Sequence, residues 1–423
     1  MTLLSSKPTD ASRVGAWAPL GNRRFSVLWG VWVAANLSMW MCDVAAAWLM
    51  TTLTDSKTLV ALVQTATALP AFLLALPGGA LADQIDRRRW FLFTLIWTGC
   101  TAAGLATATI AGALNTSVLL ALAFAGGVGA ALRWPAFSAL LPEVVARGQL
   151  SQAMALHGLA VHGGRVGGPL VAGALLALWG GSSVFVVGAV VSLVSAMVIL
   201  RWDYAPLSRK RRTMSMAQSI RSGARYAWRS QRLRASNVRI CALFTAISAM
   251  MALLPLLART YGQTGPQTYT ALLACVGAGA MAGVILLPRL RARFGSQAIV
   301  TWGSLFLGIV IAGIALAPHA GWAAPVLFAS GTVWLAIGNT LNVTAQLALP
   351  DRLRARGMAV FFMAAMGGGA GGAAVFGALA DHVGVRGALL AVAIMTIGLW
   401  CAMRRRWPVV LAEAEAEAGG GRA

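Results

Sequence analysis

Long apolar stretches alternate with short polar ones along almost the whole chain. A helix that rises 1.5 Å per residue needs about 20 apolar residues to cross a hydrocarbon layer of about 30 Å. Stretches of this kind recur at 26–52, 58–82, 90–112, 117–139, 151–179, 182–201, 238–259, 269–288, 297–318, 322–346, 355–380 and 385–403. The pattern predicts an all-α integral membrane protein with twelve transmembrane helices.

The longest polar interval, 202–237, divides these helices six and six. We therefore expect an N-terminal lead at 1–24, a six-helix half at 25–201, a basic linker at 202–237, a second half at 238–403 and a low-complexity tail at 404–423. Within the linker, Ile220, Tyr226 and Trp228 lie among arginines. An amphipathic helix against anionic lipid headgroups and a solvated connector both fit this composition.

The two halves share a glycine pattern. An offset of 204 residues pairs Gly163, Gly164, Gly167, Gly168, Gly173 and Gly180 with Gly367, Gly368, Gly371, Gly372, Gly377 and Gly384. Internal repeats are typical of transporters whose substrate site lies near the bilayer midplane between related halves. The pentapeptide GALAD at 377–381 belongs to this repeat, whereas the GALAD at 79–83 ends a helix of the opposite direction.

Charge is distributed very unevenly. Of the 34 basic residues, 29 fall on the same side of the membrane as the N-terminus, and three, Lys57, Arg259 and Arg386, fall on the other side. The remaining two, Arg133 and Arg165, lie inside predicted spans. This asymmetry follows the positive-inside rule and predicts cytoplasmic termini. It also accounts for the net charge of +22 without nucleic acid as a partner.

Motifs for cofactor chemistry are not found. The five cysteines lie in or beside apolar spans at unrelated spacings, so neither a disulfide framework nor a metal site is expected. An ATP-binding loop of the G-x4-GK-(S/T) type does not occur. We expect no cofactor, and an ion gradient, most simply of protons, as the energy source.

Two motifs in the sequence resemble signatures of the major facilitator superfamily. GALADQIDRRR resembles its loop signature between helices two and three, carried here by Gly79, Asp83, Asp86, Arg87, Arg88 and Arg89. Gln84 stands where the superfamily usually has Arg, and Asp86 where it usually has Gly. GRVGGPLVAG resembles its antiporter signature, with Gly164, Gly168, Pro169, Ala172 and Gly173 in place and Ala155 instead of the upstream Gly.

The run from Met39 to Asp83, with LPEVVARGQLSQAMAL and GGRVGGPLVAG, resembles the branch that includes the enterobactin exporter and transmembrane secretion effectors. The resemblance implies two pseudo-symmetric six-helix halves, a cytoplasmic gate formed by the loop residues, and export rather than uptake. It also implies that helices one, four, seven and ten line the cavity. The candidate substrate residues are then Asn36 and Trp40 on helix one, and Asn339, Asn342 and Gln346 on helix ten. Interhelical hydrogen bonds are the alternative role for these side chains.

Charged residues inside the spans are candidates for ion coupling. A charge at mid-bilayer costs about 2.5–3.5 kcal/mol on insertion scales, so it usually faces a partner or a water-filled cavity. We predict that Asp43 and Arg165 approach each other and exchange a proton for substrate; a static ion pair is the alternative. We expect Arg133 to lie near the cytoplasmic end, where its stem can snorkel to the surface, and to have a structural or surface role. Ala123 occupies the position of the superfamily's coupling Arg.

The sequence thus favours a monomeric exporter in a bacterial-type inner membrane. Its expected substrate is a small, partly apolar organic compound such as a siderophore, a drug or a lipid-like metabolite, exchanged for protons. Two alternatives remain: a proton-coupled uptake symporter, and a membrane sensor or scaffold that does not transport. An enzyme is not expected, because the acidic residues and histidines form no cluster at one interface.

Overall fold

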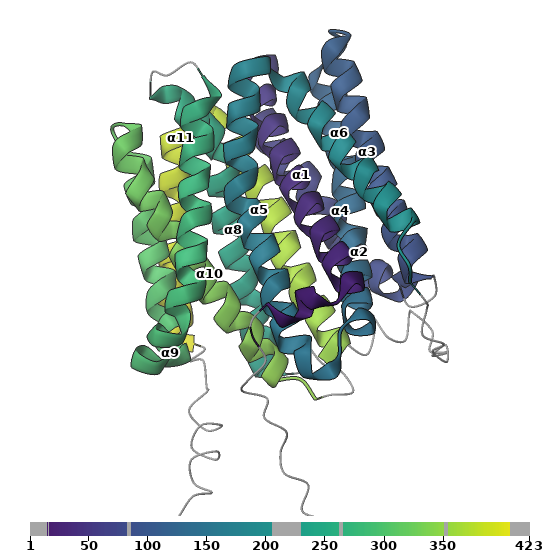
Figure 1. The fold of residues 1–423 in the computed structure, drawn as a ribbon. Helices are drawn as coiled ribbons and strands as arrows, with labels where there is room; N and C mark the ends of the chain where they lie inside the picture. The colour runs from purple at the N-terminus through teal and green to yellow at the C-terminus, as the bar shows by residue number, and fades with distance from the viewer. Residues whose placement is uncertain are drawn as a thin grey trace, which may run out of the picture.

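The computed structural model describes residues 15, 17–82, 86–204, 230–261, 265–350 and 354–406. A short 3-10 helix, η1 (Ala18–Gly21), precedes the bundle, and a second, η2 (Arg147–Gln149), precedes α5. The α-helices are α1 (Arg23–Leu53), α2 (Lys57–Ala82), α3 (Arg87–Ile110), α4 (Thr116–Val144), α5 (Leu150–Trp179), α6 (Gly181–Leu200), α8 (Gln231–Thr260), α9 (Pro266–Leu316), α10 (Ala320–Leu347) and α11 (Arg354–Arg406). Figure 1 shows them as one bundle of roughly parallel rods.

Two of these helices each supply two membrane spans. α9 has 51 residues and α11 has 53, and each contains one non-helical glycine, Gly295 (φ 73°) and Gly384 (φ 78°). A straight helix of that length would extend well beyond a bilayer. The chain reverses at both glycines, so the ten long helices in the described part provide the twelve predicted spans. α8 begins at Gln231, so its first turns lie within the interval 202–237 that was predicted as a linker.

The helices run alternately between the two ends of the bundle. We call the end at which α1 begins the inner end, at the bottom of Figure 1, and the opposite end the outer end. The turn of α9 lies at the inner end and that of α11 at the outer end (Figure 1). Residues 205–229 of the predicted linker and the predicted tail beyond residue 406 fall outside the described residues.

The glycine repeat has a structural counterpart in both halves. Gly180, between α5 and α6, has φ 79°, and its repeat partner Gly384 has φ 78°. Both positions need the left-handed backbone that glycine adopts without strain. Gly164 lies against Asn36 of α1, and its partner Gly368 lies against the Cys241 carbonyl of α8. The α5–α1 contact is thus repeated as the α11–α8 contact.

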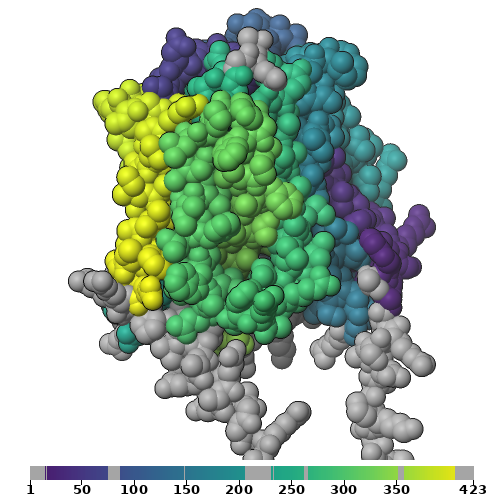
Figure 2. All heavy atoms as spheres, turned by 90° about the vertical axis from the view of Figure 1, so that its left-hand side faces the viewer, coloured from purple at the N-terminus to yellow at the C-terminus, as the bar shows by residue number. Residues whose placement is uncertain are grey.

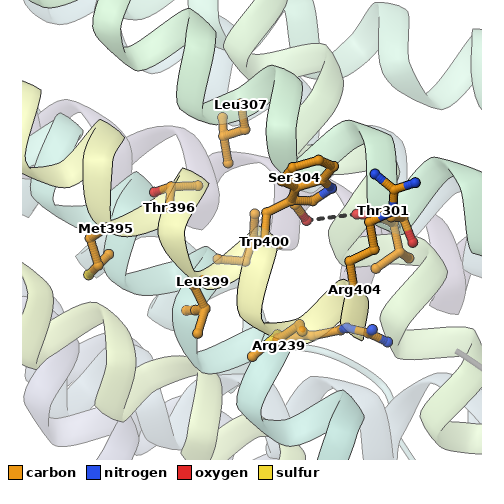
Figure 3. Close-up of a pocket in the computed structure, with 13 residues that line it drawn as sticks. Arg239, Thr301, Ser304, Leu307, Met395, Thr396, Leu399, Trp400 and Arg404 are labelled. Atoms are coloured by element: carbon orange, nitrogen blue, oxygen red, sulfur yellow. Dashed lines mark hydrogen bonds between the residues drawn. The ribbon is translucent and has the colours of Figure 1, made fainter. Parts of the chain in front are cut away.

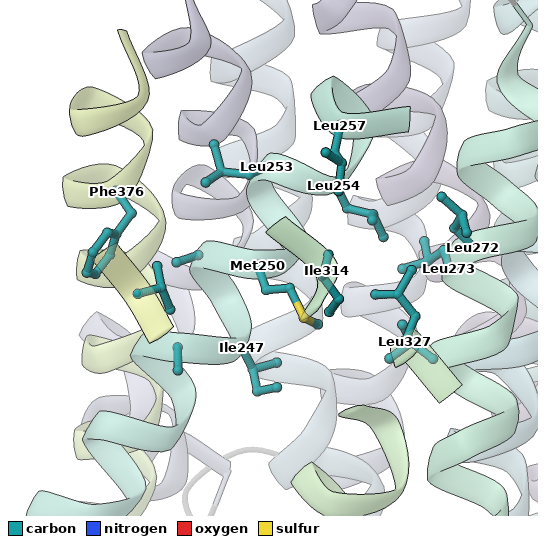
Figure 4. Packing of buried hydrophobic residues seen from close by; sticks show 14 of the residues in the cluster. Ile247, Met250, Leu253, Leu254, Leu257, Leu272, Leu273, Ile314, Leu327 and Phe376 are labelled. Atoms are coloured by element: carbon teal, nitrogen blue, oxygen red, sulfur yellow. The ribbon is translucent and has the colours of Figure 1, made fainter. Parts of the chain in front are cut away.

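The second half has a dense apolar core. Met250, Leu253, Leu254 and Leu257 of α8 pack with residues of α9, α10 and α11, as Figure 4 shows. The lipid-facing side is apolar as well: in Figure 2, green α9 and the yellow end of α11 cover the face toward the viewer. Large apolar side chains on these two helices, such as Ile285 and Ile394, are exposed. Exposed and buried faces are both apolar, as expected for helices within a membrane.

Hydrogen bonds between the halves lie toward the outer end. The Asp381 carboxylate of α11 accepts from the backbone amides of Lys57 (2.7 Å) and Thr58 (3.1 Å), and so caps the N-terminus of α2. Arg259 of α8 donates to the Thr51 carbonyl of α1. Tyr269 of α9 stacks on Trp48 of α1, with ring centroids 6.1 Å apart. These contacts hold the two halves together at the outer end.

We expect Asp381→Ala to favour opening of the outer end. Loss of an N-cap destabilises by about 0.5–2 kcal/mol, which corresponds to an increase of about 2- to 30-fold in the open population. Opening can be followed with a membrane-impermeant maleimide added from outside to Tyr269→Cys in a chain without its native cysteines. Tyr269 is 4% exposed in this structure, so the maleimide reaches position 269 only when the outer end opens. The labelling rate should rise with Asp381→Ala.

Asp55→Ala is the matched control. Asp55 lies in the same outer turn, and the described part of the chain shows no hydrogen bond to its side chain. Equal labelling rates in the Asp381 and Asp55 variants would show that the cap does not hold the outer end closed.

Candidate functional site

A cavity of about 230 Å³ lies among the helices of the first half. Among the described residues of the second half, Met366 of α11 also lines it. Small and hydroxyl-bearing side chains form most of its wall. Its lining comprises Ser38, Met39, Cys42, Asp43 and Ala46 of α1; Gln64, Thr67, Ala68 and Ala71 of α2; Thr98, Thr101, Ala102 and Leu105 of α3; Leu122, Ala123, Gly126, Gly127, Ala130 and Arg133 of α4; and Ser192 of α6.

Two opposite charges share this cavity. Asp43 of α1 and Arg133 of α4 both line it and interact electrostatically. Arg133 is 2% exposed, and its Nη2 lies 3.4 Å from the Met39 sulfur, a weak acceptor. Tyr269 of the second half is also within electrostatic range of Asp43. A half-buried carboxylate within electrostatic range of groups in both halves can respond to relative motion of the halves.

The predicted approach of Asp43 and Arg165 is wrong. Arg165 lies over the rings of Trp40 and Trp334, with its guanidinium carbon 4.9 and 4.2 Å from their centroids. It forms no ion pair within the described residues. The reason is the rotation of α1: Trp40 is directed toward α5, where it meets Gly168, whereas Asp43 is directed into the cavity beside α4.

The expectation for Arg133 is also wrong. It does not reach the surface, because α4 continues to Val144 and places Arg133 about three turns inside the helix end. Pro135 and Pro142 lie within α4 without ending it. Arg133 was recognisable as a candidate functional residue because it is a charge inside a predicted span. Its depth was underestimated because the predicted span was shorter than α4.

The other candidate substrate residues lie away from the cavity. Asn36 is fully buried, and its Nδ2 donates to the Trp32 carbonyl at 2.8 Å. Asn339 accepts from Arg291 of α9 at 3.0 Å, and Gln346 donates to Asn342 at 2.6 Å. None of these candidates lines the 230 Å³ cavity. Their observed contacts are hydrogen bonds within or between helices.

The arginines predicted for a gate loop instead begin a helix. Asp86 caps α3 by accepting from the Arg89 amide at 2.9 Å. Arg87 forms an ion pair with Glu143 of α4 at 2.6 Å, and Arg88 donates to the Ile199 carbonyl of α6 at 3.0 Å. These contacts hold α3, α4 and α6 together within the first half. Gly79 lies in α2, and Asp83 lies outside the described residues.

Tyr204 extends this inner cluster beyond α6. Its hydroxyl donates to the second carboxylate oxygen of Glu143. Burial, followed by this hydrogen bond, raises the pKa of Tyr204 above its usual range, so the phenol stays neutral. Glu143 therefore binds one cation and one neutral donor at the inner end.

A second pocket, of about 40 Å³, lies within the second half. Figure 3 shows Arg239 of α8, Thr301 and Ser304 of α9, and Trp400 and Arg404 of α11 around it. Arg404 lies over the rings of Trp302 and Trp400, 5.3 and 5.5 Å from their centroids. No acidic residue lines this pocket, so it lacks the carboxylate that distinguishes the larger cavity. The described residues also contain no cluster of potential metal ligands.

Comparison with known proteins agrees with this architecture. A family model described as "Transmembrane secretion effector" matches residues 14–419, almost the whole chain. The chain belongs to this family. Transmembrane secretion effectors are major facilitator proteins, and the chain is accordingly a multi-pass membrane transporter rather than an enzyme.

A more distant relative is the staphyloferrin A transporter of Staphylococcus aureus (strain NCTC 8325 / PS 47). It is 22% identical over 165 residues, which make up 39% of this transmembrane secretion effector and 42% of that transporter. The match thus spans less than half of either protein.

Solved structures show the same fold at low identity. A POT family transporter in complex with 5-aminolevulinic acid has a TM-score of 0.74 at 14% identity, over 90% of this chain and 96% of that one. The nucleoside transporter NupG has a TM-score of 0.71 at 12% identity, covering 90% and 99%. An inward-facing bacterial homologue of the human lysosomal transporter Spinster has a TM-score of 0.72 at 15% identity, covering 90% and 95%. These similarities extend to the fold alone.

Proposed function

We propose that this transporter exports a small, partly apolar organic compound across a bacterial-type inner membrane in exchange for protons. The observation that carries the proposal is the cavity lined by both Asp43 and Arg133, which interact electrostatically. A protonatable group that faces a cavity inside a membrane protein is typical of a proton pathway. The family description supports secretion, and the staphyloferrin A transporter supports a siderophore as one class of cargo.

Proton exchange would follow from the rocking of the two halves. Arg133 belongs to the same half as Asp43, so it stays beside the carboxylate, whereas Tyr269 moves with the other half. Each movement would change the charge environment of Asp43 and hence its proton affinity. Pockets that bind drug-sized ligands usually have volumes of about 300–1,000 Å³. The cavity here has about 230 Å³, so substrate entry requires the halves to separate.

Everted membrane vesicles provide the test. With an acidified lumen, addition of siderophores or lipophilic drugs should release protons and should accumulate the transported compound inside the vesicles. Vesicles from cells that lack the protein are the control, and an uncoupler should abolish the accumulation.

Two results would contradict proton-coupled export. Accumulation that persists after collapse of the proton gradient would exclude coupling to protons. Accumulation in right-side-out vesicles with an acidic exterior, together with none in everted vesicles, would identify an uptake symporter instead.

A further inference from the structure

Arg165 occupies the contact between the two halves near the middle of the bundle. It lies on α5 of the first half, over Trp40 of α1 in the same half and over Trp334 of α10 in the other. All three residues lie near the centres of their helices. This is the depth at which transporters with two related halves bind substrate.

The Arg165 charge has aromatic neighbours but no anion. Its Nε is buried and has no hydrogen-bond partner, and no described acidic residue lies within ion-pair distance. Aromatic rings stabilise a cation through their faces, but they cannot accept the planar fork of N–H donors that a guanidinium presents. A buried charge with unused donors is unfavourable until an acceptor arrives.

Other polar atoms without partners lie on this stretch of α5 and on the facing stretch of α1. The Oδ1 of Asn36, the Nε1 of Trp40 and the Nδ1 of His162 are all buried without hydrogen-bond partners in the described structure. His162 also interacts electrostatically with Arg165. Gly164 and Gly168 of α5 leave the space in which Asn36 and Trp40 approach α5 closely. The Trp40 Nε1 is a donor, the Asn36 Oδ1 is an acceptor, and the His162 Nδ1 can be either; polar atoms without a partner among the described residues are available to a ligand.

We propose that Arg165 anchors the carboxylate of an organic acid, with Trp40 and Trp334 covering the ring or apolar body beside it. Arginine binds carboxylates through two parallel hydrogen bonds, and this geometry suits the unused Arg165 donors. The proposal deepens the export function and rests on it: the cargo belongs to the class of aromatic or apolar organic carboxylates. Because Trp334 comes from the second half, a bound carboxylate contacts both halves at once.

Binding to the purified full-length protein tests this assignment without transport. In titration calorimetry at pH 7, 2-naphthoate should bind, whereas 2-naphthamide, which has the same ring but no charge, should bind at least tenfold more weakly. Arg165→Gln should abolish naphthoate binding. Arg165→Lys keeps the charge but loses the planar fork, and should weaken binding at least tenfold.

Arg404→Gln is the matched control, because Arg404 also lies over two tryptophans but sits in the small pocket of Figure 3. Naphthoate binding should be unchanged in this variant. Circular dichroism and gel filtration check the fold, and if Arg165→Gln does not fold, Arg165→Lys decides alone. Absence of naphthoate binding to the wild type, equal binding of the amide, or unchanged binding in the folded Arg165 variants would each overturn the proposal.

The outcome is separable from that of the export experiment. Naphthoate binding through Arg165 in a protein that moves no protons would leave the anion site standing and refute proton-coupled export. Proton-coupled export that does not change in Arg165→Lys would support the transport function and refute the anion site.

Discussion

Asp43→Asn should reduce substrate-driven proton release to background in everted vesicles. An amide keeps the size and hydrogen-bonding capacity of the side chain but cannot carry a proton, so the coupling step loses its acid. Among the described residues, Asp43 is also the only carboxylate that lines the 230 Å³ cavity, so none of the other described lining residues can replace it as an acid. The measurement is proton release and substrate accumulation in the same vesicle preparation.

Arg133 allows the structural and coupling roles of Asp43 to be separated. Asn at position 43 removes the one described carboxylate that interacts electrostatically with Arg133, which is 2% exposed, so the single variant should lower thermal stability. The double variant Asp43→Asn with Arg133→Gln removes both charges and should recover thermal stability while proton release remains absent. Recovery of proton release together with stability would reduce Asp43 and Arg133 to a structural pair.

The twelve spans and the internal repeat were predictable because each depends on local composition. A membrane span requires a continuous apolar segment, so hydropathy alone predicted the long apolar helices of the described part, which fit twelve spans. The repeat was visible because close helix contacts need glycines at fixed spacings, as Gly164 and Gly368 show. The turn at Gly384 likewise repeats the turn at Gly180.

The charge partners were not predictable, because they depend on how neighbouring helices rotate. Trp40 and Asp43 lie within one turn of α1, yet one contacts α5 and the other faces α4. Asp43 was assigned to Arg165 because both are charges inside predicted spans, and the sequence does not show how α1 is rotated. In the observed orientation the Trp40 Cβ lies against Gly168 of α5, and Asp43 lines the cavity with Arg133.

The arginines after GALAD illustrate a different limit. A motif identifies which residues occur together but not which neighbours they meet. Arg87 binds Glu143, and Arg88 binds a backbone carbonyl of α6. Within the described residues both arginines stabilise the first half, and they form no contact with the second. The depth of Arg133 was missed because the predicted span ended at 139, whereas α4 continues to Val144.

Gly168→Ala should impair transport strongly without changing any charge. A methyl group at this position would overlap the Trp40 Cβ and come within 3.3 Å of the Met41 amide nitrogen, so α1 and α5 must separate. Overpacking of this kind destabilises by about 1–3 kcal/mol, equivalent to about 5- to 150-fold in an equilibrium. Because α1 carries Asp43 and α5 carries Arg165, the shift should lower both substrate accumulation and naphthoate binding.

Gly163→Ala is the control on the same helix, because no atom lies within 4 Å of the added methyl group. Transport and thermal stability should match the wild type there. The comparison distinguishes two roles for the antiporter-type motif. If Gly168 serves close packing, Gly168→Ala lowers the melting temperature along with transport. If it serves bending at Pro169 during the transport cycle, transport falls while the melting temperature stays unchanged, and the packing account of this motif is wrong.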